Sequence, residues 1–477
     1  MRRNRFALSA RVFATALLAA ASCCASSTLR AQERTPGAYA KSRWDQQAID
    51  LAKLFDAVID TVDKKFFDEA RLKQIDWRGR ANAVRRSVLS AATTVDAVRQ
   101  INALLAELKT SHTGLFTPDD YQYYELLDII DVRPDQSNLM SRRFWGTGPY
   151  YPGIGAFTRL IDGRHFVDGI LEGSPAERSG LKYGDEILSV DGMSYSPIVV
   201  FRGKIGLTVE LEVRRDVDAA PMRLPVPVIP IRPTTAFAAA TEASARVIEH
   251  SGVRIGYVHI WSSNESNTFK AALRRFEPRN IVQERVLKSG VAIIPNQLGD
   301  APAEVREMLT LPKPLDFLIV DMRGRVGGNV GVVGQYLEAL DAKNYWGTWR
   351  PINRSDARMR VGPGDPQNPP FRGRSALLID HHSRSAAEIM AYGYKRSAFG
   401  PVIGTPTAGA VSSGALTVMP GDLLLYVAVV GHEHDGQRLE GVGVSPDHRV
   451  DRPLPYAAGA DPVLDTAVEL LAKRAPK

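Results

Sequence analysis

Two serines lie where an apolar segment of the sequence gives way to a helical pattern. Residues 376–379 (ALLI) are typical of a short buried strand, and apolar positions from residue 386 onward follow helical spacing. Ser385 directly precedes that predicted helix. A serine at such a turn lies beside the free N–H groups of the helix N-terminus, where the helix dipole favours negative charge. Ser385 is therefore a candidate nucleophile, and Ser383 is the alternative.

A structural role is also available to Ser385. Ser385 and Glu388 have the spacing of a capping box, in which the serine caps the helix and the glutamate bonds back to it. A nucleophile would additionally need donors for an oxyanion. The amide of Ala386 is one candidate, and Gly327 or Gly328 in "RGRVGG" would let a second backbone amide approach closely. Local sequence alone favours the capping role.

Residues 148–232 are predicted to form a separate block of short strands and turns. The run "GSPAERSGLKYGDEILSVDG" at residues 173–192 resembles the most specific motif of the PDZ family, and "PGIGAF" resembles its glycine-rich loop. Consecutive N–H groups form an anion nest, and an exposed strand edge accepts a peptide as an added strand. The resemblance implies that a peptide carboxylate is held by the loop residues Gly153, Ile154, Gly155, Ala156 and Phe157. The alternative is a β module that only positions its neighbours.

The remaining segments complete a multidomain α+β chain. Apolar residues follow helical spacing through most of residues 44–109, so residues 36–147 are predicted to be a helical N-terminal region. Strands alternate with helices in residues 233–477, which predicts an α/β core with a mostly parallel sheet. Ligands of such sheets bind beyond the carboxyl ends of the strands.

An ordered set of motifs follows the PDZ-like block: "YVHI", "LIVDMRGRVGG", "SRSAAEIMA", "GTPTAG" and "LEGVGVSPDHRV". Together they resemble the carboxyl-terminal processing proteases and their tricorn-type relatives. The resemblance implies a serine endopeptidase with a crotonase-like core. It also makes Ser385 the nucleophile, because the nucleophilic serine of the family lies three residues before a helix glutamate, which is Glu388 here. That glutamate would support the site.

The base that would activate Ser385 differs between the two branches of this family. The processing branch uses a lysine in a "TxGK" run, and this chain has Ala410 at that position. The tricorn-type branch uses a histidine in a run such as "LKTSHTGLF", which supplies Ser111 and His112, and a glutamate before "GVxPD", which is Glu440. The resemblance thus implies that His112 takes the proton of Ser385, while Glu440 orients the imidazole through Ser111. We expect the rate to rise with pH through roughly 6 to 7.5.

Other histidines offer alternatives. His382, followed by His381, is the second candidate for the base because both lie close to Ser385 in sequence. His259 lies in an apolar strand and is predicted to be a core residue. His432 and His434 have the look of a metal pair, but no third ligand accompanies them, so we predict no metal. Since no Walker loop, zincin motif or Rossmann fingerprint stands out, we predict no cofactor.

Two other functions compete with the endopeptidase. One is a catalytically inactive scaffold whose PDZ domain binds protein C-termini, which Ala410 favours. The other is an acyl hydrolase that uses the same serine on a small ester. The matching Ser111, His112 and Glu440 favour the peptidase, and its expected partners are peptides or proteins with free apolar C-termini.

The N-terminus predicts export. Arginines precede an apolar run at residues 12–21, and small residues follow, as in a secretory signal covering residues 1–31. Cleavage is expected near Ala25–Ser27 or after Ala31, giving a secreted or periplasmic protein. The two cysteines, Cys23 and Cys24, lie in this segment, and lipidation of Cys23 would attach the chain to a membrane. The net charge of +7 comes from scattered residues, which argues against nucleic-acid binding.

Overall fold

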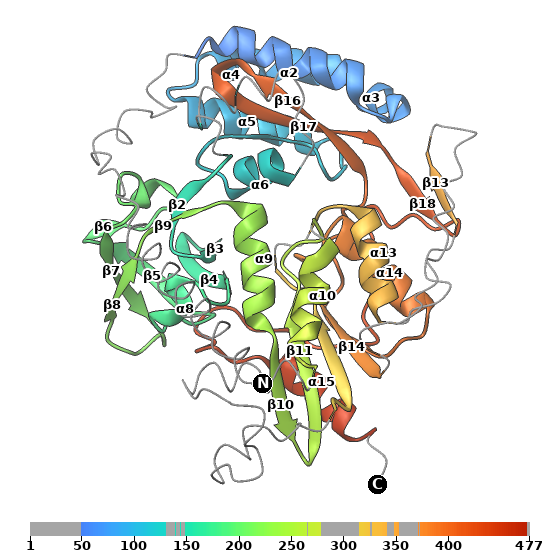
Figure 1. Ribbon diagram of the computed structural model, residues 1–477. Helices are drawn as coiled ribbons and strands as arrows, with labels where there is room; N and C mark the ends of the chain where they lie inside the picture. The colour runs from blue at the N-terminus through green and yellow to red at the C-terminus, as the bar shows by residue number, and fades with distance from the viewer. Residues whose placement is uncertain are drawn as a thin grey trace, which may run out of the picture. The chain divides into compact units, whose positions relative to one another are not determined.

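A computed structural model describes residues 49–129, 139, 144, 148–264, 266–277, 314–324, 327–340, 348–352, 371 and 373–474 (Figure 1). All of them belong to the second of two units, Arg43–Lys477. The predicted signal segment and Cys23 lie outside the described residues. Within the described part of the chain, no helix combines the length and apolarity needed to cross a membrane.

The N-terminal helices pack on a strand pair from near the C-terminus. The helices are α2 (Leu51–Lys65), α3 (Glu69–Gln74), α4 (Trp77–Leu89) and α5 (Thr94–Ala106). Side chains of Asp50 and Thr93 cap α2 and α5 by accepting backbone N–H bonds. The apolar faces of α2, α4 and α5 share one core with β16 (Ser413–Met419) and β17 (Leu423–Val430). Figure 1 shows these helices beside that strand pair.

The short strand β1 (Gly114–Phe116) ties the N-terminal region to the rest of the fold. It pairs antiparallel with β17, in a sheet of order β1-β17-β16. Helix α6 (Tyr121–Ile129) follows β1 and contributes buried tyrosines to a neighbouring aromatic core. The pairing of β1 with β17 brings the preceding residues, Ser111 and His112, to the C-terminal part of the chain.

The PDZ-like block is an antiparallel sheet of order β3-β4-β5-β7-β8. Its strands are β3 (Ala156–Ile161), β4 (Arg164–Ile170), β5 (Glu186–Val190), β7 (Thr208–Arg214) and β8 (Met222–Pro227), with β6 (Met193–Ser194) beside β5. Two flanking strands, β2 (Tyr151–Gly153) and β9 (Ile229–Ile231), pair with each other. The predicted short helix is present as α8 (Pro175–Arg178), with Ser174 as N-cap and Pro175 in its first turn.

The core sheet has the order β10-β11-β12-β14-β15-β19. Its strands are β10 (Arg246–His250), β11 (Val253–His259), β12 (Phe317–Asp321), β14 (Arg374–Ile379), β15 (Val402–Gly404) and β19 (His448–Arg449). Only the β10–β11 pair in this sheet is antiparallel. The predicted mostly parallel sheet is confirmed, and so is the multidomain α+β class.

Both faces of the core sheet are covered, which explains its apolar strands. One face packs on α10 (Ser266–Arg274), α13 (Val330–Ala339) and α14 (Ala386–Arg396). The other face packs on α15 (Pro462–Ala472). Helix α9 (Pro233–Ser244) leads from the PDZ-like block into β10, and a small ribbon pairs β13 (Trp349–Pro351) with β18 (His432–His434).

Candidate active site

Ser385 lies at the turn between β14 and α14 and is the N-cap of that helix. Its backbone has φ 57° and ψ −122°, a left-handed conformation that costs free energy for any residue with a side chain. The N–H of Ser385 donates to the carbonyl of Ala410 at 2.9 Å and to the carboxylate of Glu388 at 3.2 Å. The glutamate's half of the predicted capping box is therefore present. A strained backbone at a half-buried serine is typical of functional sites.

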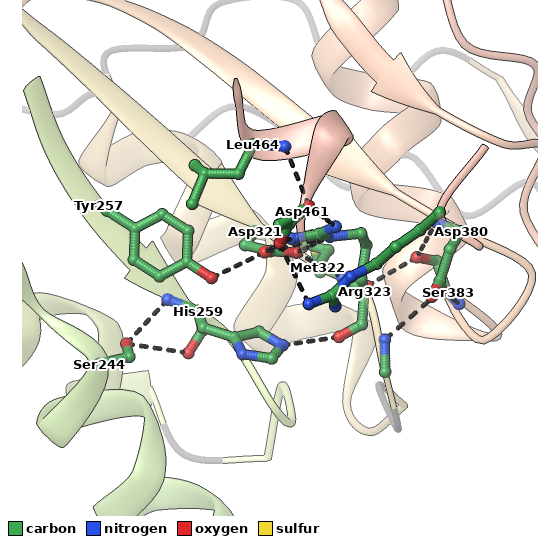
Figure 2. A network of polar contacts seen from close by, with 12 residues as sticks. Ser244, Tyr257, His259, Asp321, Met322, Arg323, Asp380, Ser383, Asp461 and Leu464 are labelled. Carbon is green, nitrogen blue, oxygen red and sulfur yellow. Dashed lines mark hydrogen bonds and ion pairs between the residues drawn. The ribbon is translucent and has the colours of Figure 1, made fainter. Parts of the chain in front are cut away.

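Ser383, the alternative nucleophile, has a structural role. Its side chain is completely buried, and its hydroxyl donates to the carbonyl of Met322 at 2.6 Å. The same oxygen accepts the N–H of Asp380 at 3.1 Å, and Figure 2 shows these neighbours. Because the hydroxyl proton is already given to a carbonyl, these contacts favour Ser385 over Ser383.

Ser111, His112 and Glu440 form a continuous relay of hydrogen bonds. The hydroxyl of Ser111 lies 3.1 Å from the carboxylate of Glu440 and 2.8 Å from Nδ1 of His112. A carboxylate only accepts, so the hydroxyl donates its single proton to Glu440 and accepts from His112. Nδ1 then carries the imidazole proton, and Nε2 is left with its lone pair. This is the tautomer that a general base requires.

Glu440 accepts hydrogen bonds from three residues, of which Ser111 is one. Its carboxylate also accepts the N–H of Ser111 at 2.6 Å and the N–H groups of Val411 and Ser412 at 3.0 and 2.9 Å. Burial opposes ionisation, but the hydrogen bonds from Ser111 and Ser412 hold the pKa of Glu440 below its usual value. The side chain at the end of the relay is therefore an anion at neutral pH.

Burial and the nearby cation of Arg384 lower the pKa of His112 to about 4. The imidazole is thus neutral at physiological pH and ready to accept a proton. The sequence-based expectation of a rise through roughly pH 6 to 7.5 assumed a solvated imidazole, and the half-buried position of His112 favours a lower range.

Ser385 is linked to the relay through the loop that follows β15. The N–H of Ser385 donates to the carbonyl of Ala410. The N–H of Val411, which follows Ala410, donates to the carboxylate of Glu440, and that carboxylate also accepts the hydroxyl proton of Ser111. The structure therefore brings Ser111, His112 and Glu440 into one chain of contacts. Ser385 is joined to it through the backbone of residues 410 and 411, and not through its hydroxyl. Ala410, whose side chain offers no base, contributes its backbone to this link.

The two glycines predicted to line an oxyanion hole differ in how they are held. Gly328 has φ 137°, and a Cβ there would lie 2.4 Å from Oδ1 of Asn264. The carbonyl of Gly327 accepts the N–H of Ser263 at 3.0 Å. Ala386 is buried in the first turn of α14. Gly328 is thus required by a close approach of two segments, and the oxyanion role of the three residues stays a prediction.

His381 and His382 point toward the PDZ-like block. Nη2 of Arg159 lies 2.7 Å from His381 and 3.2 Å from His382, and Nε2 of His382 lies 3.1 Å from the carboxylate of Asp168. Arg159 and Asp168 belong to β3 and β4. These contacts give both histidines a part in the junction between two domains, which favours His112 as the base.

His259 is a satisfied core residue, as predicted. It is 8% exposed, and its ring bonds the carboxylate of Glu172 at 2.8 Å and the carbonyl of Arg323 at 2.7 Å. Figure 2 shows the bond to Arg323. Both partners are acceptors, so both ring nitrogens donate and the ring is cationic. Burial opposes this charge, but Glu172 and Asp321 raise the pKa of His259 to about 9.

His432 and His434 lie buried on β18, packed around Trp349. Nε2 of His432 bonds the hydroxyl of Ser413 at 2.7 Å. Among the described residues, no group of three or more histidine, cysteine or acidic side chains is placed to hold a metal ion. The aromatic packing gives this pair a structural role.

The predicted carboxylate-binding loop lies at the start of β3, an edge strand of its sheet. Carbonyls of Ile154 and Gly155 accept N–H groups of Ala176 and Leu171 at 2.9 and 2.8 Å. Gly155 has φ 83°, and a Cβ there would meet Ser174 at 2.3 Å. The loop is therefore held in a shape that requires glycine. Among the residues that the structure describes, no strand pairs with the outer edge of β3, and peptide binding there stays a prediction.

We expect ligands beyond the carboxyl ends of the parallel strands, but the sequence-based prediction names no residues for such a site. A cavity of about 760 Å³ lies between the PDZ-like block and the core, beyond the carboxyl ends of β11, β12 and β14. Its lining includes Asp321 and Arg323, and Arg323 also bonds Asp461 at 2.8 Å (Figure 2). The run "VDMRG", in which charged residues directly follow a buried strand, was the available signal. The predicted catalytic residues do not line this cavity.

A serine at a strand-to-helix turn beside a Glu–Ser–His relay, in an α/β core joined to a PDZ-like block, has the architecture of a PDZ-containing serine hydrolase. Residues 254–450 match the model of peptidase family S41, and residues 153–200 match that of the PDZ domain. The C-terminal part of the chain therefore contains a domain of peptidase family S41, and its antiparallel β block contains a PDZ domain.

Individual relatives come from both branches of this family. A tricorn protease homolog of Streptomyces coelicolor is 24% identical over 85% of this chain and 31% of its own length. The carboxy-terminal processing protease CtpB of Bacillus subtilis is 30% identical over 28% of each chain. The chain thus spans less than a third of either relative. The solved structure of a photosystem II D1 C-terminal processing protease has 19% identity, covers 89% of this chain and 97% of its own, and gives a TM-score of 0.47.

Proposed function

We propose that this chain is a serine endopeptidase in which His112 activates Ser385. The observation that carries the proposal is the Glu440–Ser111–His112 relay, with bonds of 3.1 and 2.8 Å that leave Nε2 of a neutral imidazole free to accept a proton. The strained backbone of Ser385 at the N-terminus of α14 supports its role as nucleophile.

The proposed reaction follows the acyl-transfer scheme of serine peptidases. His112 removes the proton of the Ser385 hydroxyl as its oxygen attacks the peptide carbonyl. The amides of Ala386 and of Gly327 or Gly328 stabilise the oxyanion, and the protonated imidazole then gives its proton to the leaving amine. Water, activated by the same imidazole, hydrolyses the acyl-enzyme. Glu440 remains ionised and stabilises the imidazolium that forms twice in each cycle.

The proposed substrates are proteins with free, apolar C-termini, captured by the PDZ domain. The open edge of β3 and the glycine-requiring loop at Gly155 support this substrate class. We further propose that the chain is exported by its N-terminal signal to the periplasm or the medium. N-terminal sequencing of the mature protein tests export, and an intact Met1 on the chain from the cell envelope would contradict cleavage.

Labelling with a fluorophosphonate probe tests the enzymatic proposal. The wild-type chain should be labelled, Ser385→Ala should lose both labelling and peptide cleavage, and Ser383→Ala should keep them. A folded wild-type chain that neither reacts with the probe nor cleaves any peptide would favour the scaffold instead, for which Ala410 is the supporting observation. Cleavage of small esters without cleavage of peptides would favour the ester hydrolase.

A further inference from the structure

Two buried glutamates divide four consecutive backbone amides between them. The N–H groups of Gly409 and Ala410 donate to Glu388 at 2.7 and 2.6 Å. The next two, of Val411 and Ser412, donate to Glu440 at 3.0 and 2.9 Å. Residues 409–412, which we call the connector, therefore join the glutamate next to Ser385 to the glutamate behind His112.

Glu388 is fully buried and accepts from four donors. Besides Gly409 and Ala410, these are the N–H of Ser385 at 3.2 Å and the hydroxyl of Thr407 at 2.7 Å. The Thr407 hydroxyl already accepts the N–H of Val444 at 2.7 Å, so it gives its proton to Glu388. Burial raises the pKa of Glu388 above its usual value, and the four hydrogen bonds oppose that shift. All four partners donate and the N-terminus of α14 favours negative charge, so the contacts fit an ionised carboxylate.

The same contacts fix the backbone of Ser385. Its N–H is shared between the carboxylate of Glu388 and the carbonyl of Ala410, and the N–H of Ala410 donates to Glu388. These bonds hold the left-handed conformation of Ser385, which a residue with a side chain adopts only when its surroundings enforce it. The same bonds place one end of the connector, and Glu440 places the other.

We propose that Glu388 is a positioning residue, which sets Ser385 relative to His112 through the connector. The inference rests on the proposed peptidase function and deepens it. The side chain of Ala410 offers no base, but its carbonyl accepts the N–H of Ser385 and its N–H donates to Glu388. The distance between nucleophile and base would then depend on a carboxylate that touches neither substrate nor the reacting atoms.

Glu388→Gln tests the proposal with little change of shape. One half of the amide would present N–H donors to partners that are themselves donors, so at least one backbone bond is lost whichever way the amide turns. We expect kcat and the fluorophosphonate labelling rate to fall together by about 10²-fold, as for a small misplacement of a reacting group. KM should stay within about twofold, since Glu388 does not touch substrate.

Two further variants complete the test. Thr407→Val removes one of the four donors and should lower kcat about tenfold, so the proposal stays testable if Glu388→Gln does not fold. Tyr394→Phe is the matched control, because its hydroxyl bonds Ser375 at 2.8 Å near the other end of α14. It should leave kcat unchanged.

The outcomes separate this inference from the proposed function. Folded Glu388→Gln and Thr407→Val proteins that keep kcat within twofold, or whose loss lies in KM, would overturn the positioning role while leaving the peptidase intact. A wild-type chain that is inert toward probe and peptides would overturn the proposed function, and the inference with it.

Discussion

Glu440 bonds both the amide and the hydroxyl of Ser111, a residue that precedes it by 329 positions. The two bonds, 2.6 and 3.1 Å long, join the segment before β1 to the loop before β19. Because the hydroxyl must donate to the carboxylate, the next bond fixes the tautomer of His112. The hydrogen bonds that orient the His112 imidazole thus come from two segments that lie far apart in the sequence.

Glu440→Gln should weaken catalysis and stability together. The amide cannot accept from all four donors that the carboxylate now satisfies, so a buried N–H is left unpaired at a cost of about 1–3 kcal/mol. We expect kcat/KM to fall about 10-fold to 100-fold, less than on removal of His112, since Glu440 orients and does not transfer the proton. Peptide kinetics combined with urea unfolding measures both effects, and unchanged values of both would refute the relay.

Activity should persist to lower pH than an ordinary histidine would allow. The base must be neutral, so kcat/KM is lost as pH falls through the pKa of His112, which burial and Arg384 lower to about 4. Arg384→Gln removes a nearby cation, raises that pKa and moves the acid limb to higher pH. Arg384→Lys keeps the charge and should shift the limb less. A pH profile of the wild type centred near the ordinary value of 6.5 would contradict this environment.

Gly328→Ala should damage the site more than an equivalent change at an open turn. A Cβ at Gly328 would lie 2.8 Å from the backbone carbon of Ser263, whereas Gly192, at φ 76°, has nothing within 4 Å of its Cβ position. Gly192→Ala therefore carries only the conformational cost of about 1–2 kcal/mol. We expect a greater loss of thermal stability and at least a tenfold loss of labelling for Gly328→Ala. Equal losses of thermal stability and labelling in the two variants would contradict the close approach of Gly328 to Ser263.

Peptide binding to the PDZ domain should require a free carboxylate. A peptide with an apolar C-terminal residue should bind the Ser385→Ala chain with modest affinity, and its C-terminal amide should bind at least tenfold more weakly, because the amides of the 153–157 loop would lose their anion. Fluorescence anisotropy with the two peptides makes the comparison. Equal affinities would argue against the loop as a carboxylate site.

The sequence reveals the elements of this site better than their environment. The N-cap at Ser385, the helix α8 and the parallel strands follow from local patterns, and the pairing of Ser111–His112 with Glu440 followed from family motifs. Three of the four donors to Glu388 lie about twenty residues downstream, and the contacts of His381 and His382 lie in another domain. Such long-range partners leave no local signal.

Long-range contacts also explain why the pKa of His112 and the role of Glu388 were predicted only in part. The expected pH range for His112 assumed a solvated imidazole, and burial changes it. Glu388 was predicted only to support the site, yet its four donors connect Ser385 to the loop that contains Ala410. The capping-box spacing accounts for one of those four bonds. The other three bonds come from Thr407, Gly409 and Ala410, in the loop that follows β15.

The rate at which a fluorophosphonate labels Ser385 in the wild type and in His112→Ala tests the central claim most directly. The probe reports the reactivity of the serine alone, so peptide binding and product release do not enter. We predict that His112→Ala remains folded and is labelled several orders of magnitude more slowly, nearly as poorly as Ser385→Ala, because members of one catalytic unit are strongly non-additive. A folded His112→Ala chain labelled within tenfold of the wild-type rate would contradict the account, and His382 would then be the base to examine.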